Sequence, residues 1–388
     1  MNWDYIWQDQ REKEKAMKNK KNIDFSAAIS SIFAIIIGLF VGLIVLLLSN
    51  YRQAIPGFYT ILTGSLTHGM KGVGQVFYYA TPIILTGLSV GFAFKTGLFN
   101  IGASGQFIVG AFGAVFVGIL FKGLGSVHWI IAILASVLFG AIWGSIPGIL
   151  KAYFNVNEVI ASIMMNYIGM YAVNWTVKGY KPLFNNLRNE SKNVAVTAEI
   201  PKMGMDRIFP DSSVNGGFLI AILVVIIIYI VLHKTAFGSE LKAVGYNRKA
   251  SKYAGINERK SIILSMTIAG AVSGLAGGLL YLAGTGKHIE IVDVLAAEGF
   301  NGISVALLGV CHPFGILFAG IFIAFLTAGG FYLQLFEFST EIIDIIIAVI
   351  IYFSAFALIV KTMISRFRQN KENKTSPKVD GSKGGNLT

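Results

Sequence analysis

Polar side chains stand at isolated positions inside long apolar stretches of this chain. An unpaired amide or carboxylate in hydrocarbon costs several kcal/mol, so each such group must find a protein partner, a polar solute or water. Because amide groups both donate and accept hydrogen bonds, they suit either a bound solute or a tie between helices. The candidate binding residues are Asn100, Ser104, Gln106, Asn157, Glu158, Asn166, Glu298 and Asn301, with the aromatic rings of Phe99 and Phe300 beside them.

The remaining reactive residues do not support enzymatic chemistry. The chain contains no GxxxxGK[ST] phosphate loop, so we expect it not to hydrolyse ATP itself. Its five histidines show no HExxH or clustered spacing, and the single Cys311 cannot form a multi-cysteine site, so no metal site is predicted. Ser104 as a nucleophile would need a histidine on a facing helix, and the sequence offers no plausible one. We therefore predict that the protein is not an enzyme.

The composition is that of a membrane protein. With 54% hydrophobic and 13% charged residues, the chain carries several apolar runs of about 20 residues, the length that crosses roughly 30 Å of hydrocarbon. These runs lack the alternation of barrel strands, so the predicted fold class is an all-α integral membrane protein. Ten spans are expected, near residues 27–49, 78–95, 102–121, 128–150, 158–177, 216–233, 262–282, 298–310, 313–333 and 341–361. The eighth is short enough to be a broken or re-entrant segment.

The positive charge indicates topology rather than nucleic-acid binding. The net charge is +12, and Lys and Arg of membrane proteins collect in cytoplasmic loops. We predict a basic cytoplasmic segment over residues 1–26, a transmembrane domain over residues 27–362 and a disordered cytoplasmic tail over residues 363–388. Within the domain, residues 178–215 form an external loop and residues 234–260 a cytoplasmic platform. Residues 51–77 are expected in water and could include an interfacial helix.

The platform, residues 234–260, is a long polar interruption between two apolar runs. Residues 240–244 and 249–254 can each form a short helix, and Gly245 and Gly255 are placed to end them with positive φ. The small side chains of Ala243, Ala250 and Ala254 would allow close docking of another protein. An ordinary basic loop is the alternative.

Glycines indicate where helices meet. Gly270, Gly274 and Gly278 share one helix face and predict a packing seam, with either a neighbouring helix or a second subunit. Residues 97–102 and 299–304 each place an Asn among glycines at the junction of apolar segments. This echo is typical of transporters built from an internal repeat, although chance could also produce it.

Four separate segments together resemble a known family. They are Gly97-Leu-Phe-Asn-Ile-Gly-Ala-Ser-Gly-Gln106, Asn157-Glu-Val-Ile-Ala-Ser-Ile-Met-Met-Asn-Tyr167, Leu241-Lys-Ala-Val-Gly-Tyr-Asn247 and Gly299-Phe-Asn-Gly-Ile-Ser-Val-Ala-Leu-Leu-Gly309. In this order and spacing they resemble the permease subunits of bacterial nucleoside-type ABC importers, within the branched-chain amino acid and ribose permease family. The resemblance covers about residues 27–362.

The resemblance implies that the platform couples the membrane helices to an ATPase. In such permeases short cytoplasmic helices enter grooves on ATPase subunits, which hold ATP and Mg²⁺, so this chain would bind no cofactor. The coupling residues implied are Glu240, Leu241, Ala243, Val244, Gly245, Asn247, Arg248, Ala250, Ala254 and Gly255. Other implied partners are a second, related permease chain, a substrate-binding lipoprotein and the lipid bilayer of the bacterial cytoplasmic membrane, with both termini cytoplasmic.

The resemblance also implies a nucleoside as substrate, moved inward by alternating access. Ribose hydroxyls and base edges suit the amide groups of the candidate binding residues, and the rings of Phe99, Phe300 and Tyr167 could stack on the base. A permease for sugars or branched-chain amino acids is an alternative. Another is a self-sufficient secondary transporter coupled to an ion gradient through Glu158 or Glu298.

Overall fold

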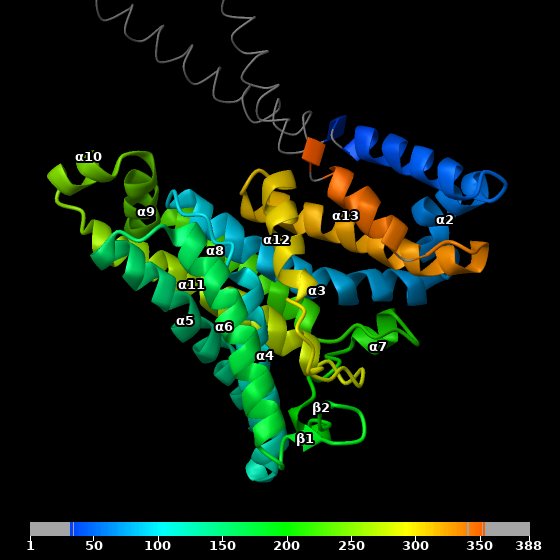
Figure 1. Ribbon diagram of the computed structural model, residues 1–388, viewed down its shortest axis with the longest axis horizontal. Helices are drawn as coiled ribbons and strands as arrows, with labels where there is room; N and C mark the ends of the chain where they lie inside the picture. Colours follow the sequence, from blue (N-terminus) through cyan, green and yellow to red (C-terminus); the bar gives the residue numbers. More distant parts are fainter. Residues whose placement is uncertain (1–31, 34, 340, 351, 354–388) are drawn as a thin grey trace, which may run out of the picture.

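The described part of the chain is mostly helical (Figure 1). A computed structural model describes residues 32–33, 35–339, 341–350 and 352–353; the predicted segments 1–26 and 363–388 lie outside these ranges. After a helix over Ile35–Ser49, the elements are α2 (Ala54–Thr67), α3 (Gly69–Lys95), α4 (Ala103–Leu120), η1 (Lys122–Val127), α5 (His128–Phe154), α6 (Glu158–Gly179), β1 (Phe184–Asn185), β2 (Glu190–Ser191), η2 (Val196–Ala198), α7 (Met205–Ile208), α8 (Gly217–Lys234), α9 (Ala236–Tyr246), α10 (Arg248–Tyr253), α11 (Glu258–Tyr281), α12 (Ala297–Leu308), α13 (Pro313–Phe331) and η3 (Tyr332–Phe336).

Six helices of the described part are long and apolar enough to cross a bilayer: α3, α4, α5 with η1, α8, α11 and α13 with η3. The all-α membrane class is therefore confirmed, while ten spans remain a prediction. The other four expected spans are also helical where they are described. The helix over Ile35–Ser49 is shorter, α6 has 22 residues but is more polar, α12 has 12 residues, and residues 341–350 are helical.

The segment 51–77, which is expected in water, is mostly helical; the position of α2 in water stays a prediction, while α3 extends a candidate membrane span into this segment. Its residues form α2 and the first part of α3, which begins nine residues before the expected start of its span at residue 78. Glycines let α2 press closely on the end of α13 and on the residues that follow. A Cβ on Gly57 would lie 2.8 Å from Cε2 of Phe338, and one on Gly64 would lie 3.0 Å from Cδ2 of Tyr332. Close packing at these glycines holds α2 against the end of α13 and the residues after it.

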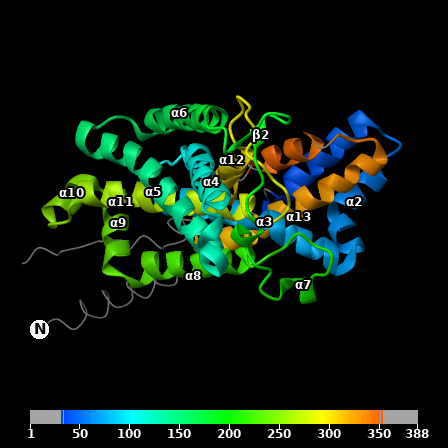
Figure 2. The same ribbon diagram turned by 90° about the horizontal axis from the view of Figure 1, so that it is seen from below.

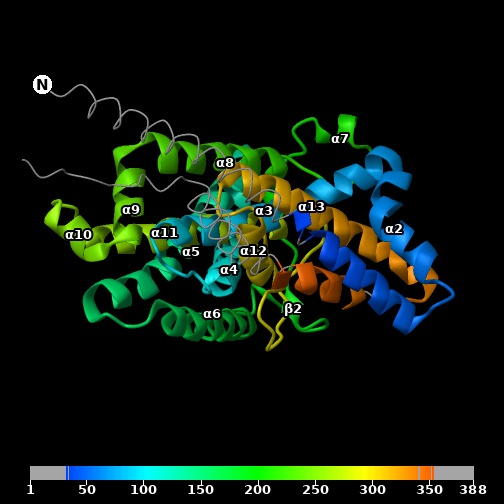
Figure 3. The ribbon, with the colours of Figure 1, turned by 90° about the horizontal axis from the view of Figure 1, so that it is seen from above.

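The predicted glycine seam joins α11 to α5 within the same chain, and the two helices run side by side (Figure 3). A Cβ on Gly140 would lie 2.7 Å from Cα of Gly274, and one on Gly144 would lie 2.8 Å from Cα of Gly270. Backbone therefore touches backbone along the seam. Gly110 of α4 packs against Gly274 from another side, so α4, α5 and α11 form one tightly packed group.

The predicted external loop folds against the connection between α11 and α12. β1 and β2 pair antiparallel, the Ser191 N–H donates to Ile289 O at 2.9 Å, and the Ile291 N–H donates to Asn189 O at 3.1 Å. The platform helices α9 and α10 project at the end of the molecule opposite α2 (Figure 2).

The second echo segment lies next to the start of α4, because Gly299 packs directly on the backbone of Ser104, two residues after the first echo segment. Residues 97–102 precede α4, however, whereas residues 299–304 lie inside α12. The two segments thus differ in conformation, and the internal repeat stays a prediction.

Candidate functional site

The platform contains two short helices, α9 and α10, and it ends at the start of α11. Side chains cap the starts of all three helices. The side-chain oxygens of Thr235, Asn247 and Asn257 each accept a hydrogen bond from the backbone N–H three residues later, at 3.0, 3.0 and 3.1 Å. Such caps satisfy N–H groups that the first turn of a helix leaves unpaired. The helices expected at residues 240–244 and 249–254 are confirmed as α9 and α10, with α9 longer than expected.

The inner face of α9 packs against the membrane helices. Leu241 and Val244 are buried there. A Cβ on Gly245 would lie 2.7 Å from the carbonyl oxygen of Lys95. Gly97, which has φ +71°, belongs to the same turn and also lies against Gly245. The expectation that Gly245 ends a helix with positive φ is wrong, because it lies inside α9. Its missing side chain instead permits backbone contact between α9 and the turn that joins α3 to α4.

The hairpin is tied to α11 by a charge-assisted hydrogen bond. Arg248 Nε donates to Glu258 Oε2 at 2.8 Å, which joins the first residue of α10 to the first residue of α11. The Ser251 hydroxyl donates to the Asn247 carbonyl at 2.9 Å, and Gly255 has φ +82° at the turn, as expected. These contacts make α9, α10 and the start of α11 one stiff unit that can transmit a displacement.

The outer face of the platform carries two tyrosines that the sequence interpretation missed. Tyr246 is 90% exposed and Tyr253 is 94% exposed. Lys249 and Lys252 are exposed nearby, so the surface is both aromatic and basic. Of the predicted coupling residues, Glu240, Gly245, Asn247, Ala250, Ala254 and Gly255 are exposed, while Ala243 and Arg248 are half-buried. A large aromatic residue inside a polar segment was the sequence signal that could have identified Tyr246 and Tyr253.

A cluster of amides lies at the start of α4. Asn100 Nδ2 donates to Gln106 Oε1 at 2.9 Å, and Gln106 Nε2 donates back to Asn100 Oδ1 at 3.1 Å. Asn100 also donates to the Ser89 hydroxyl of α3 at 3.2 Å. Both amide side chains are fully buried. The pair therefore ties the α3–α4 turn to both helices, and it presents no surface to a solute in this conformation.

Two further buried groups extend these ties to α6 and α12. The Gly105 N–H donates to Asn166 Oδ1 at 2.8 Å, and Asn166 Nδ2 donates to Ile101 O at 3.0 Å. The Ser104 hydroxyl donates to Ala296 O, just before α12, at 2.8 Å. The helices α3, α4, α6 and α12 therefore meet at the first turn of α4. A movement of this turn would displace groups that are hydrogen-bonded to each of them.

The other predicted binding residues are not gathered with Asn100. Asn157 caps α6 by accepting from the Val159 N–H at 2.9 Å. Glu158 forms an ion pair with Lys151 at 2.8 Å, and Glu298 forms one with Lys287 at 3.0 Å. These three residues stabilise helix starts. Of the rest, Phe99 is half-buried with its ring 4.9 Å from that of Phe94, Phe300 is exposed and Asn301 is half-buried.

One face of α6 is exposed and differs in composition from the exposed face of α5. Met164, Tyr167, Tyr171 and Trp175 stand on it at helical spacing. The exposed large residues of α5 are mainly Ile and Leu. Tyr, Trp and Met are enriched at protein interfaces, and Tyr and Trp also where a helix meets the membrane–water interface, whereas contact with the hydrocarbon interior needs only aliphatic side chains. In the described part of the chain, no group of three or more His, Cys, Asp or Glu side chains could hold a metal ion.

Comparison with known proteins finds relatives over most of the chain. The family described as branched-chain amino acid transport system / permease component matches residues 72–355. The chain is 36% identical to the guanosine ABC transporter permease protein NupP of Bacillus subtilis (strain 168), over 88% of this chain and 97% of that protein. It is 33% identical to the nucleoside ABC transporter permease protein NupB of Lactococcus lactis subsp. cremoris, over 89% and 96%.

A relative with a different printed substrate is the glucose ABC transporter permease protein TsgB13 of Haloferax volcanii, 30% identical over 76% of this chain and 78% of that protein. No solved structure matches the chain. With most of its length matched by the family and by relatives that it covers almost completely, the chain belongs to the branched-chain amino acid transport system permease family.

Proposed function

We propose that this chain is a permease subunit of an ATP-driven importer that carries nucleosides. The printed names of two relatives, which cover about nine-tenths of this chain at 36% and 33% identity, support nucleosides over sugars. The glucose permease is less similar, at 30% identity, and it matches a smaller share of this chain, 76%. The ion-coupled alternative has less support, because Glu158 and Glu298 are paired with lysines at helix starts.

The platform is the surface on which an ATPase subunit, loaded with ATP and Mg²⁺, would act. This assignment rests on one observation: α9 turns glycine and aliphatic residues inward and tyrosine outward. Exposed tyrosines are frequent anchors of protein interfaces, and Lys249 and Lys252 favour an acidic groove on the partner. The inner face passes displacement to the α3–α4 turn through Gly97 and Gly245.

Movement of that turn would rearrange the amide ties at the start of α4. Asn100 and Gln106 bond each other in this conformation, so we expect them to act first as helix ties. The aromatic face of α6, with Tyr167 and Tyr171, is where a second permease chain and the substrate pathway would meet this chain. Aromatic faces there can stack on a nucleobase. Phe99, Phe300 and Asn301 remain proposed pathway residues.

We place the platform and both termini in the cytoplasm, because Lys and Arg concentrate there, and the hairpin β1–β2 on the external side. That side would receive the substrate-binding lipoprotein. Cysteine labelling from each side of the membrane tests this orientation. Labelling of a cysteine at Lys249 from outside intact cells would contradict it.

Reconstitution tests the function as a whole. The chain, its partner permease, the ATPase and the binding lipoprotein are placed in vesicles, and uptake of radiolabelled guanosine is followed with and without ATP. We expect accumulation that depends on ATP and on the binding protein. Uptake of glucose or a branched-chain amino acid with no uptake of any nucleoside would refute the substrate assignment, and uptake without the ATPase would refute the mechanism.

A further inference from the structure

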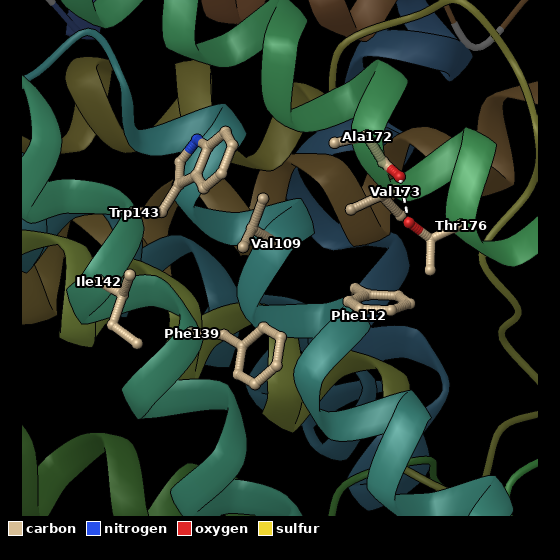
Figure 4. A pocket seen from close by; sticks show the side chains of 8 residues that line it. All are labelled: Val109, Phe112, Phe139, Ile142, Trp143, Ala172, Val173 and Thr176. Carbon is tan, nitrogen blue, oxygen red and sulfur yellow. Dashed lines mark hydrogen bonds between the residues drawn. The ribbon is translucent and has the colours of Figure 1, made fainter.

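An apolar pocket lies between α4, α5 and α6, and the side chains that line it are shown in Figure 4. Its volume is about 260 Å³. Its walls include Val109 from α4, Phe139 and Trp143 from α5, and Ala172 and Thr176 from α6. A cavity of about 150 Å³ lined by apolar side chains can hold benzene, so this pocket has room for a longer apolar group.

Glycines on the neighbouring helices create the pocket by drawing two rings inward. A Cβ on Gly113 of α4 would lie 2.9 Å from Cγ of Phe139, and one on Gly169 of α6 would lie 3.0 Å from Nε1 of Trp143. Each ring therefore sits over a glycine, and a hollow remains between the two rings. Because the rings are anchored in this way, the hollow is a built feature of the helix contacts and not a gap that side chains could easily close.

The polar groups in the walls are already satisfied. Trp143 Nε1 donates to Met165 O at 3.1 Å, and the Thr176 hydroxyl donates to Ala172 O at 2.7 Å. No polar side chain in the described lining is left for a ribose, a nucleobase or a water molecule, which needs two to four polar partners. The chemistry of the pocket therefore favours an apolar occupant and excludes the transported substrate.

The mouth of the pocket opens toward the surface that faces lipid. Ile142 at its edge is 55% exposed. This residue stands near the middle of α5, roughly 21 Å from one end of the helix and 18 Å from the other at about 1.5 Å per residue. The exposed residues along the same helix, such as Leu134 and Leu138, are aliphatic. At that depth the surroundings of a membrane protein are hydrocarbon chains.

A second permease chain is less well placed to fill the pocket. The α6 residues that line it, Ala172 and Thr176, are offset around the helix from the exposed stripe that contains Tyr167 and Tyr171. That stripe carries the interface-type residues, whereas the pocket continues into the aliphatic face of α5. We propose that the pocket binds the acyl chain of a membrane lipid, which enters between α5 and α6 and packs against Trp143.

Trp143 provides a reporter for this proposal, which does not depend on which substrate is carried. The assembled transporter is reconstituted in phosphatidylglycerol brominated at the middle of its acyl chains and in the same lipid without bromine. The chain contains five tryptophans, so the emission of Trp143 is taken as the difference between the wild type and Trp143→Phe. Bromine quenches tryptophan on contact, and we expect strong quenching of the Trp143 emission.

Two matched variants separate pocket occupancy from general contact with lipid. Ala172→Phe places a ring in the mouth of the pocket, whereas Leu134→Phe adds the same ring to the exposed face of α5 outside the lining. Quenching of Trp143 should fall by more than half in Ala172→Phe and stay at the wild-type level in Leu134→Phe. Equal quenching in both variants would overturn the proposal. So would the absence of quenching in the assembled transporter, which would instead assign the pocket to a partner chain.

Discussion

Replacing Gly245 by alanine tests whether the contact between α9 and the α3–α4 turn transmits the work of the ATPase. The added Cβ would lie 2.7 Å from the Lys95 carbonyl oxygen, 2.8 Å from the Thr96 carbonyl carbon and 2.9 Å from the Gly97 nitrogen. All three atoms belong to the backbone and cannot swing aside. To restore an ordinary contact of about 3.4 Å, α9 must move away by roughly 0.7 Å.

Overpacking of this size costs about 1–3 kcal/mol. A coupling free energy that is lowered by the same amount means a loss of coupling of about 5- to 150-fold. The outer face of the platform is unchanged, so the ATPase should still bind and hydrolyse ATP. The assay compares guanosine uptake and ATP hydrolysis in the same reconstituted vesicles. We expect uptake to fall by a factor in that range while hydrolysis stays close to the wild-type rate.

Gly179→Ala is the matched control, because a Cβ on Gly179 would meet no atom within 4 Å. It should leave both activities unchanged. Wild-type uptake by Gly245→Ala would refute the transmission path through the α3–α4 turn. An equal loss of uptake and hydrolysis would also refute it, because that pattern means that the variant weakens ATPase docking instead.

Three further variants probe other parts of the structure. Tyr253→Ala should weaken ATPase binding by about 2 kcal/mol, or roughly 30-fold, as measured by titration of the ATPase onto the permease; unchanged affinity would exclude this residue as an anchor. Asn100→Leu strands the Gln106 amide and should destabilise the protein by about 1–3 kcal/mol in thermal unfolding. The double variant Asn100→Leu/Gln106→Leu should lose less unfolding free energy than the sum of the losses in the two single variants. Strict additivity of these losses would contradict the pairing. Gly274→Val should lower folded yield sharply, because its Cβ would lie 2.7 Å from the Gly140 Cα, and normal yield would disprove the close seam.

The parts of the platform that could be predicted from sequence depend on local chemistry. Residues such as Asn247 start helices by bonding their own neighbours, and Gly255 reverses the chain with a φ of +82°. Gly245 was misinterpreted because a positive φ and a close approach both favour glycine. Distinguishing them requires knowing that Gly97, far away in sequence, lies against it.

The same limit explains the other differences between the sequence interpretation and the structure. The spacing of Gly270, Gly274 and Gly278 predicts a seam, but its partner on α5 follows only from the tertiary fold. Asn100 and Gln106 were recognised as buried polar residues, yet whether they bond a solute or each other depends on side-chain placement. The contacts of α2 with Tyr332 and Phe338 likewise depend on the tertiary fold, so the sequence of residues 51–77 alone does not predict them.

In the proposed coupling role, the platform has two tasks that a transport assay alone does not separate. Its outward side offers Tyr246 and Tyr253 to a partner, and its inward side holds Gly245 against the backbone of the α3–α4 turn. A defect on the outward side removes binding of the ATPase, so hydrolysis and uptake are lost together. A defect on the inward side leaves binding intact and removes only the link to the membrane helices, so hydrolysis continues without uptake. Because Tyr246 and Gly245 are neighbours in one eleven-residue helix, α9, the contrast between changes at these two residues tests the lever itself and not the general stability of the protein.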